Sequence, residues 1–243
     1  MKKEEVLDNF FKVLKSEYNY SDYTIKNYKL DLTLFFDFLN KSNINYLNKD
    51  NVLAYLKYLD KMNLKNSTIS RRISALRTFY NYLMNEGLIN SNIFLNVKNP
   101  KLEKKLPNYL NYTEMEELLE SIDIKTDEGL KRRLLIEMFY STGCRVSEII
   151  NIKVKDIDFK DKKIRIMGKG SKERIVYYGD YAKKYLDKYL SKGMDKDYLF
   201  VNKHGDKYTV EEIELIVKDI MKHLSIKTHV TPHTLRHTFA THL

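Results

Sequence analysis

The stretch NVKNPKLEKKLPN, residues 96–108, divides the chain into two parts. It holds two of the three prolines of the 243-residue sequence among four lysines, and its few apolar residues follow neither a helical nor a strand period. Proline interrupts helices and strands, and a basic stretch without an apolar face has nothing to pack against a core. We therefore predict a linker at 99–107, between a first domain at 1–98 and a second domain at 108–243.

The residues before the linker follow a helical period. Apolar side chains recur at steps of three and four in three runs, and an amphipathic segment near residues 4–18 precedes them. Gly87 follows the last run, as glycine commonly does after a helix. We therefore predict a bundle of four helices with short connections. The runs are Ile25, Tyr28, Leu32, Phe35, Phe36 and Leu39; Val52, Tyr55, Leu56 and Leu59; and Ile69, Ile73, Leu76, Tyr80 and Leu83.

The residues after the linker mix helices with one β-hairpin. Thr113 and Glu116 have the spacing of a capping box, which predicts a helix start. Over 162–178 the apolar period changes to two, and glycines flank Lys169 at the tip of a predicted hairpin. The predicted fold class is mainly α with a small β-hairpin: an N-terminal four-helix domain followed by an α+β domain. The other predicted helices cover 129–142, ended by Gly143, then 180–191, 209–224 and the residues from 232 onward.

Basic residues dominate the charge of the chain. Lys and Arg total 43 against 33 Asp and Glu, which gives a formal net charge of +10 and a pI near 9.3. This excess favours a polyanionic partner, either nucleic acid or an anionic membrane surface, over a merely well-solvated surface. The single cysteine excludes an internal disulfide framework and a Cys-rich zinc site. The N-terminal MKKEEVLDNF lacks the apolar run of a signal peptide, so we expect a cytoplasmic protein.

The C-terminal TPHTLRHTFATHL places a histidine and an arginine in the first turns of a predicted helix. Thr231 is a good N-cap, and Pro232 suits the first helical position. His233 and Arg236 then lie beside unpaired N–H groups and the positive end of the helix dipole, where an anion can bind. An ordinary capped helix with surface side chains is the alternative. His233 and His237 also have the i, i+4 spacing of zinc ligands, but Arg236 would repel a cation.

A second candidate lies in STGCRVSEII, where one helix is expected to end and a short one to begin after Arg145. That junction can aim Arg145 into a cleft; a solvated arginine, or one paired with Glu148, is the alternative. Lys169 by itself is an ordinary exposed loop lysine. Two arginines, a lysine and a histidine without clustered acids suit a phosphodiester whose developing charge is neutralised by side chains. Phosphoryl transfer without a metal then needs a nucleophile such as a protein hydroxyl.

At these motifs the sequence resembles the tyrosine recombinases, and their Xer-like and phage-integrase branch in particular. The motifs are TGCRVSEI, GKGSKER and HTLRHTFATHL, in that order. TIKNYKLDLTLFFDFL and TISRRISALRTFYNYL resemble the core-binding helices of that family, so the resemblance covers essentially the whole chain. It implies a core-binding domain at 1–98 and a catalytic domain at 108–243 that close around duplex DNA. It also implies four protomers, from one recombinase or a pair, assembled on two DNA sites.

The resemblance implies a role for each candidate residue. Arg145 and Arg236 would hold the scissile phosphate oxygens, and Lys169 would protonate the departing 5′-oxygen. His233 would hydrogen-bond the phosphate and assist proton transfer, and Glu148 would hold Arg145 in place. The implied reaction joins a tyrosine to a 3′-phosphate and releases a 5′-hydroxyl, with no metal and no cofactor.

Four further basic residues are expected to contact DNA: Arg71, Arg72, Lys172 and Arg174. Arg71 lies two residues from Ile69, about 200° around the predicted helix, and so faces away from the core.

The nucleophilic tyrosine of the family lies beyond the second arginine motif. All 19 tyrosines of these 243 residues lie upstream of Arg236, and we assign the nucleophile to none of them. We therefore expect a chain truncated at its C-terminus that binds recombination sites and does not cut them. A non-catalytic remnant that occupies such sites is the alternative, and it too predicts DNA binding.

Overall fold

The computed structural model describes residues 3–41, 50–102, 108–168, 172–193 and 197–243. The chain forms two compact units, Met1–Lys104 and Lys105–Leu243, and each has its own hydrophobic core. Within the described residues, none of the helices combines the length and the apolar composition that a membrane crossing requires.

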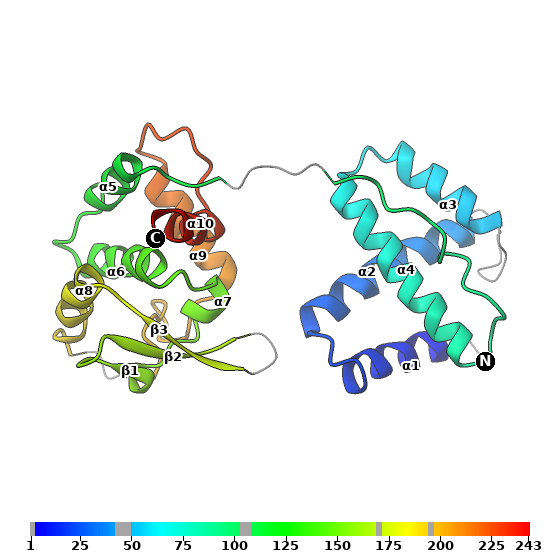
Figure 1. Cartoon of the computed structure of the whole chain (residues 1–243), viewed down its shortest axis with the longest axis horizontal. Helices are drawn as coiled ribbons and strands as arrows, with labels where there is room; N and C mark the ends of the chain where they lie inside the picture. Colours follow the sequence, from blue (N-terminus) through cyan, green and yellow to red (C-terminus); the bar gives the residue numbers. More distant parts are fainter. Residues whose placement is uncertain (1–2, 42–49, 103–107, 169–171, 194–196) are drawn as a thin grey trace. The chain divides into compact units, whose positions relative to one another are not determined.

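The described residues of the first unit form four helices, as the apolar periodicity predicts (Figure 1). They are α1 (Lys3–Ser16), α2 (Asp22–Lys41), α3 (Asp50–Lys61) and α4 (Asn66–Asn85). Aromatic rings fill the space between them, with Phe35 against Tyr55 edge to face at a centroid separation of 4.9 Å. Gly87 follows α4 with a φ of 68°, a backbone conformation that glycine adopts without a steric penalty, so its predicted place after the helix is confirmed.

The second unit combines helices with a three-stranded antiparallel sheet, which confirms the mainly α fold class. The sheet has the order β1-β2-β3, and β2 pairs with β3 so that Ile166 lies opposite Arg174. The elements are α5 (Tyr112–Glu120), α6 (Asp127–Thr142), α7 (Val146–Ile149), a 3-10 helix (Val154–Asp156), β1 (Ile157–Asp158), β2 (Lys163–Met167), β3 (Glu173–Tyr177), α8 (Asp180–Leu190), α9 (Val210–Met221) and α10 (Pro232–His242).

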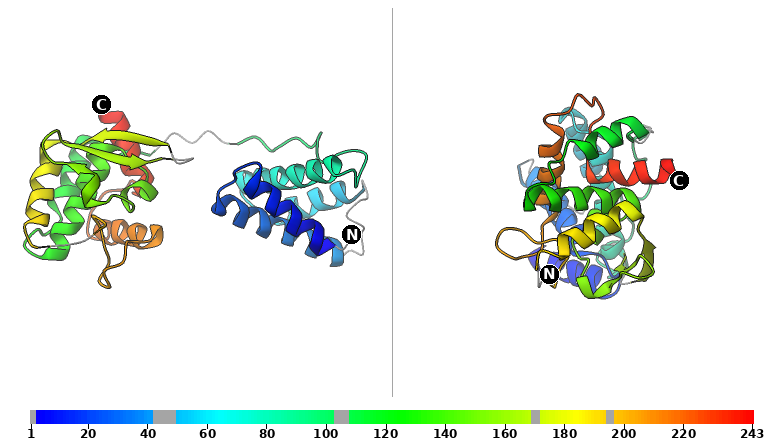
Figure 2. Two further views of the ribbon diagram at one scale, coloured as in Figure 1. Left: turned by 90° about the horizontal axis from the view of Figure 1, so that it is seen from below. Right: turned by 90° about the vertical axis from the view of Figure 1, so that its left-hand side faces the viewer.

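Helix α6 lies at the centre of the second unit. It packs against α8 on one side and α10 on another, and β3 also contacts it (Figures 1 and 2). Leu134, Leu135 and Phe139 of α6 are buried in this core. The helix ends at Gly143, as predicted, with a left-handed φ of 57°. This junction brings the end of α6, the start of α7 and helix α10 together, and it thereby forms the floor of the candidate site.

The predicted start of the first helix after the linker is wrong by two residues. Asn111, and not Thr113, caps α5: its side chain accepts a hydrogen bond from the Glu114 N–H, and the Glu114 carboxylate accepts one from the Asn111 N–H, both at 2.9 Å. Both N-x-x-E and T-x-x-E occur here, and Asn is at least as good an N-cap as Thr. For α10 the prediction is confirmed, since Thr231 is the N-cap and Pro232 opens the helix.

Candidate functional site

A buried carboxylate, that of Glu148, lies at the centre of the candidate site. Glu148 belongs to the single turn of α7, and its side chain is 3% exposed. One oxygen, Oε2, accepts a hydrogen bond from the backbone N–H of Arg145 at 2.7 Å. The other, Oε1, accepts one from Nη1 of Arg145 at 3.0 Å. The short helix is therefore capped by the same carboxylate that holds the arginine side chain, because three residues separate them.

Two further arginines reach Glu148 from distant parts of the sequence. Arg174 on β3 donates from Nη1 to Oε1 at 2.6 Å and from Nη2 to Oε2 at 2.9 Å, a two-pronged pairing. Arg236 on α10 brings Nη1 to 4.0 Å from Oε2, and the same nitrogen donates a hydrogen bond to the Gly143 carbonyl. We call Arg145, Arg174 and Arg236 the arginine cluster.

The arginine cluster keeps Glu148 ionised in spite of its burial. Burial by itself raises the pKa of this carboxyl group. The hydrogen bonds from Arg174, and from the backbone and side chain of Arg145, outweigh that effect and lower the pKa to about 2. The same pairing raises the pKa of Arg174. At neutral pH the cluster therefore holds three positive charges around one negative charge.

The guanidinium groups of the arginine cluster stay accessible although their anchor is buried. The side chains of Arg145, Arg174 and Arg236 are 49%, 37% and 34% exposed, against 3% for Glu148. Each guanidinium has five N–H donors, and the bonds described above use only part of them. The remaining N–H donors of the three guanidinium groups can therefore bind an anion, while the buried Glu148 holds these groups in place.

Two glycines make the close packing around the cluster possible. A Cβ on Gly143 would lie 2.2 Å from the ring of Phe239 of α10, so only glycine allows this approach. A Cβ on Gly168, at the end of β2, would lie 3.2 Å from Nη1 of Arg174, tighter than an ordinary contact. Glycine at 143 therefore lets α10 approach the α6–α7 junction, and the small Gly168 leaves room for the Arg174 side chain beside Glu148.

The other residues expected at the site have different outcomes. His233 lies in the first turn of α10, exposed, three residues before Arg236. Lys172 is exposed just before β3, whereas Lys169 lies outside the described residues. His237 is also exposed, and the described part of the chain contains no group of three His, Cys, Asp or Glu side chains able to hold a metal ion. The roles of these side chains stay predictions.

The sequence interpretation assigned Arg174 to DNA contact and missed its bond to Glu148. The alternating exposure of the residues along β3 could have indicated this bond. Residues 173, 175 and 177 are exposed, and Arg174 shares the half-buried face with Val176, which packs on the core. An arginine on the half-buried face of a strand is stabilised when a buried anion lies nearby.

In the first unit, Arg71 and Arg72 of α4 lie on either side of another buried carboxylate, that of Asp31 in α2. Nη1 of Arg71 donates to Oδ2 of Asp31, and Nε of Arg72 lies 3.8 Å from Oδ1. Burial raises the pKa of Asp31, and the two arginines oppose that rise. Arg71 is 37% exposed, but it does not simply face away from the core as predicted, since it reaches the buried Asp31; Arg72 is only 8% exposed. The predicted contact of Arg72 with DNA stays a prediction.

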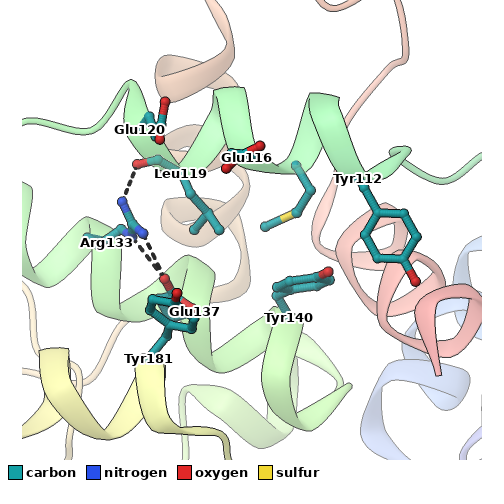
Figure 3. Close-up of a pocket in the computed structure, with 9 residues that line it drawn as sticks. Tyr112, Glu116, Leu119, Glu120, Arg133, Glu137, Tyr140 and Tyr181 are labelled. Carbon is teal, nitrogen blue, oxygen red and sulfur yellow. Dashed lines mark hydrogen bonds and ion pairs between the residues drawn. The ribbon is translucent and has the colours of Figure 1, made fainter.

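A separate hollow of the second unit, between α5, α6 and α8, does not suit a phosphate (Figure 3). It measures about 370 Å³. Arg133 lines it, but the guanidinium donates to the Glu137 carboxylate at 3.0 Å and to the Leu119 carbonyl at 2.6 Å. Glu116 and Glu120 also line the hollow, so an anion would meet negative charge there.

Comparison with known proteins shows the family of the chain. The family described as "Phage integrase family" matches residues 108–243, and "Phage integrase, N-terminal SAM-like domain" matches residues 7–87. The chain belongs to the phage integrase family. Its resemblance to the Xer-like tyrosine recombinases is thereby confirmed, since tyrosine recombinase XerC of Staphylococcus epidermidis is 38% identical over 99% of this chain and 83% of that protein.

Two solved structures place this phage integrase family member among recombinases. The XerA recombinase is 29% identical, with a TM-score of 0.51 over 99% of this chain and 84% of that one. The XerH site-specific recombinase, bound to its difH substrate in a pre-cleavage complex, is 25% identical, with a TM-score of 0.73 over 97% of this chain and 73% of that one.

Proposed function

We propose that this protein takes part in site-specific DNA recombination, and that the arginine cluster holds the scissile phosphate of duplex DNA. The observation that carries the proposal is the convergence of Arg145, Arg174 and Arg236 on the buried Glu148 carboxylate. The excess of two positive charges suits a phosphodiester with one negative charge, which gains a second as a nucleophile adds to phosphorus. A preorganised site of this kind stabilises the transition state more than the ground state.

The three arginines have different parts in this proposal. Arg174 gives two hydrogen bonds to Glu148 and so supplies most of the compensation for that charge. Arg145 gives Glu148 one side-chain hydrogen bond, and Arg236 approaches it only to 4.0 Å. The remaining N–H donors of Arg145 and Arg236 are therefore the ones that bind the phosphate oxygens, while Arg174 and Glu148 position them.

The remaining steps rest on the resemblance. A tyrosine hydroxyl attacks phosphorus, the bond from phosphorus to the 5′-oxygen breaks, and a 3′-phosphotyrosyl link forms. Lys169 gives a proton to the departing oxygen, while His233 hydrogen-bonds the phosphate and assists proton transfer by accepting the proton that the tyrosine hydroxyl loses. Four protomers assemble on two DNA sites, so that the 5′-hydroxyl of one site attacks the link on the other. No tyrosine follows Arg236 here, so we propose that these 243 residues bind DNA and form no covalent link.

The test is a DNA-binding titration by gel shift over a range of salt concentrations. Affinity should fall steeply and linearly in log–log form, because phosphate contacts release counterions. Arg145→Ala and Arg236→Ala should each weaken binding by about tenfold, which corresponds to the loss of one charged hydrogen-bonding group. Arg132→Ala is the matched control: it removes the same charge from an arginine paired with Asp219, away from the cluster. Equal losses in all three variants would contradict a phosphate site at the cluster.

A nicked suicide substrate tests the absence of covalent chemistry. After incubation with the 243-residue chain, a denaturing gel should show no protein–DNA adduct. A covalent band would mean that an upstream tyrosine serves as the nucleophile.

A further inference from the structure

The first unit contains a buried ion pair network around Asp31. The side chain of Asp31 is fully buried between α2 and α4, whose places in the bundle are seen in Figure 1. Its Oδ2 accepts from Nη1 of Arg71, which also donates to the Asn27 carbonyl at 3.4 Å. Within the described residues, Oδ1 of Asp31 and Nε of Arg72 make no hydrogen bond. The hydrogen bond that Asp31 accepts through Oδ2 therefore comes from Arg71, the more exposed of the two arginines.

This geometry is a poor way to stabilise a bundle. A buried ion pair offsets the loss of hydration only when its members are fully hydrogen-bonded, and here 3.8 Å separates Arg72 from the nearer oxygen. Arg72 also contacts the Met62 sulfur through Nη1 at 3.9 Å, and it interacts with the Tyr55 hydroxyl. Asp31 is the counter-charge of the buried Arg72, but that role does not require its hydrogen bond to the more exposed Arg71. Orientation of Arg71 explains that bond.

Arg71 is the member of the network that can reach a ligand. Its side chain is 37% exposed, while one nitrogen is fixed to the buried carboxylate. A long arginine side chain loses rotamer freedom when it binds a phosphate, and a side chain already held in place loses less. The second unit has a similar arrangement, since the buried Glu148 holds Arg145 at an accessible position.

We propose that Asp31 is a positioning residue that holds Arg71 ready to contact a phosphate of duplex DNA. The inference rests on the proposed function, since it assumes that the first unit binds DNA. Two effects of removing the Asp31 carboxylate on DNA affinity oppose each other. Removal of a negative charge from a basic protein should by itself tighten DNA binding, whereas loss of the anchor should weaken it.

The experiment measures the affinity of the 243-residue chain for a duplex by fluorescence anisotropy. Asp31→Asn should weaken binding by about three- to tenfold, as should Arg71→Ala. The double variant should bind no more weakly than Arg71→Ala alone, because the two changes remove one contact. Asp37→Asn, an exposed aspartate on the same helix, is the matched control and should leave affinity unchanged or slightly higher.

Each other outcome overturns the inference. Asp31→Asn binding as tightly as the unchanged chain, losses that add in the double variant, or no effect of Arg71→Ala would all exclude a positioning role. Because Asp31→Asn leaves Arg72 buried without a counter-charge, circular dichroism must show that it is folded. If it is not, the same comparison is made in the Arg72→Met background, where no unpaired charge is buried. An unchanged chain that fails to bind DNA would instead refute the proposed function itself.

Discussion

Substitution of Glu148 by Gln tests whether the arginine cluster depends on this carboxylate. Glutamine keeps the shape of the side chain and removes its charge, so it imitates the protonated acid. The pKa of Glu148 lies at about 2, against an ordinary value of 4.5. Since one pKa unit corresponds to about 1.4 kcal/mol, the arginines favour the ionised form by about 3 kcal/mol. We expect Glu148→Gln to lower the free energy of unfolding at pH 7 by roughly that amount.

The contribution of Glu148 to the free energy of unfolding should decrease as pH falls. A carboxylate whose pKa is depressed in the folded protein stabilises it fully above the unfolded pKa, and the contribution disappears as pH falls toward the folded pKa. The difference between the unchanged chain and Glu148→Gln should therefore be constant above about pH 5.5 and fall to about 1.4 kcal/mol at pH 3. Other carboxylates with depressed pKa values, such as Asp219, titrate in both proteins and cancel in this difference.

Urea unfolding followed by circular dichroism measures these free energies. The chain has two units, so the transition of the second must be identified. Cys144, the single cysteine, is buried beside Arg145 and becomes reactive to a thiol reagent at pH 7 only when that region opens. Glu117→Gln, an exposed position on α5, is the control and should change stability by less than about 0.5 kcal/mol. Unchanged stability of Glu148→Gln at pH 7, or a difference that does not depend on pH, would refute the reasoning.

Two stability predictions concern the ends of helices. Gly143→Ala should lower the free energy of unfolding by about 3 kcal/mol, because its Cβ would clash with the ring of Phe239. Gly87→Ala has a similar positive φ but open space around it, so it should cost only about 1 kcal/mol. Equal losses in urea titrations would contradict the clash. Asn111→Ala should cost about 1 kcal/mol through the lost helix cap, and Thr113→Ala should be close to neutral; the reverse order in thermal melts would restore the cap expected from the sequence.

The sequence by itself determined the helices, the hairpin and several of their ends. Apolar residues at steps of three and four produce a helical face regardless of what packs against it, and alternation produces a strand in the same way. Gly87 and Gly143 end helices because glycine adopts a left-handed backbone, and Thr231 with Pro232 begins one. All these signals act within a few residues, so no tertiary contact is needed to read them. The cap of α5 was missed because two local signals overlapped.

Tertiary structure alone decided which charges far apart in the sequence meet. Arg174 lies 26 residues from Glu148, and Arg71 lies 40 residues from Asp31. Nothing local distinguishes these pairs from the many other acids and bases of a chain with 43 Lys and Arg and 33 Asp and Glu. Whether a carboxylate is buried depends on the elements that fold over it, and burial is what makes an arginine partner necessary. The arginine cluster therefore exists only because the α6–α7 junction, β3 and α10 pack together, and no single one of these elements specifies it.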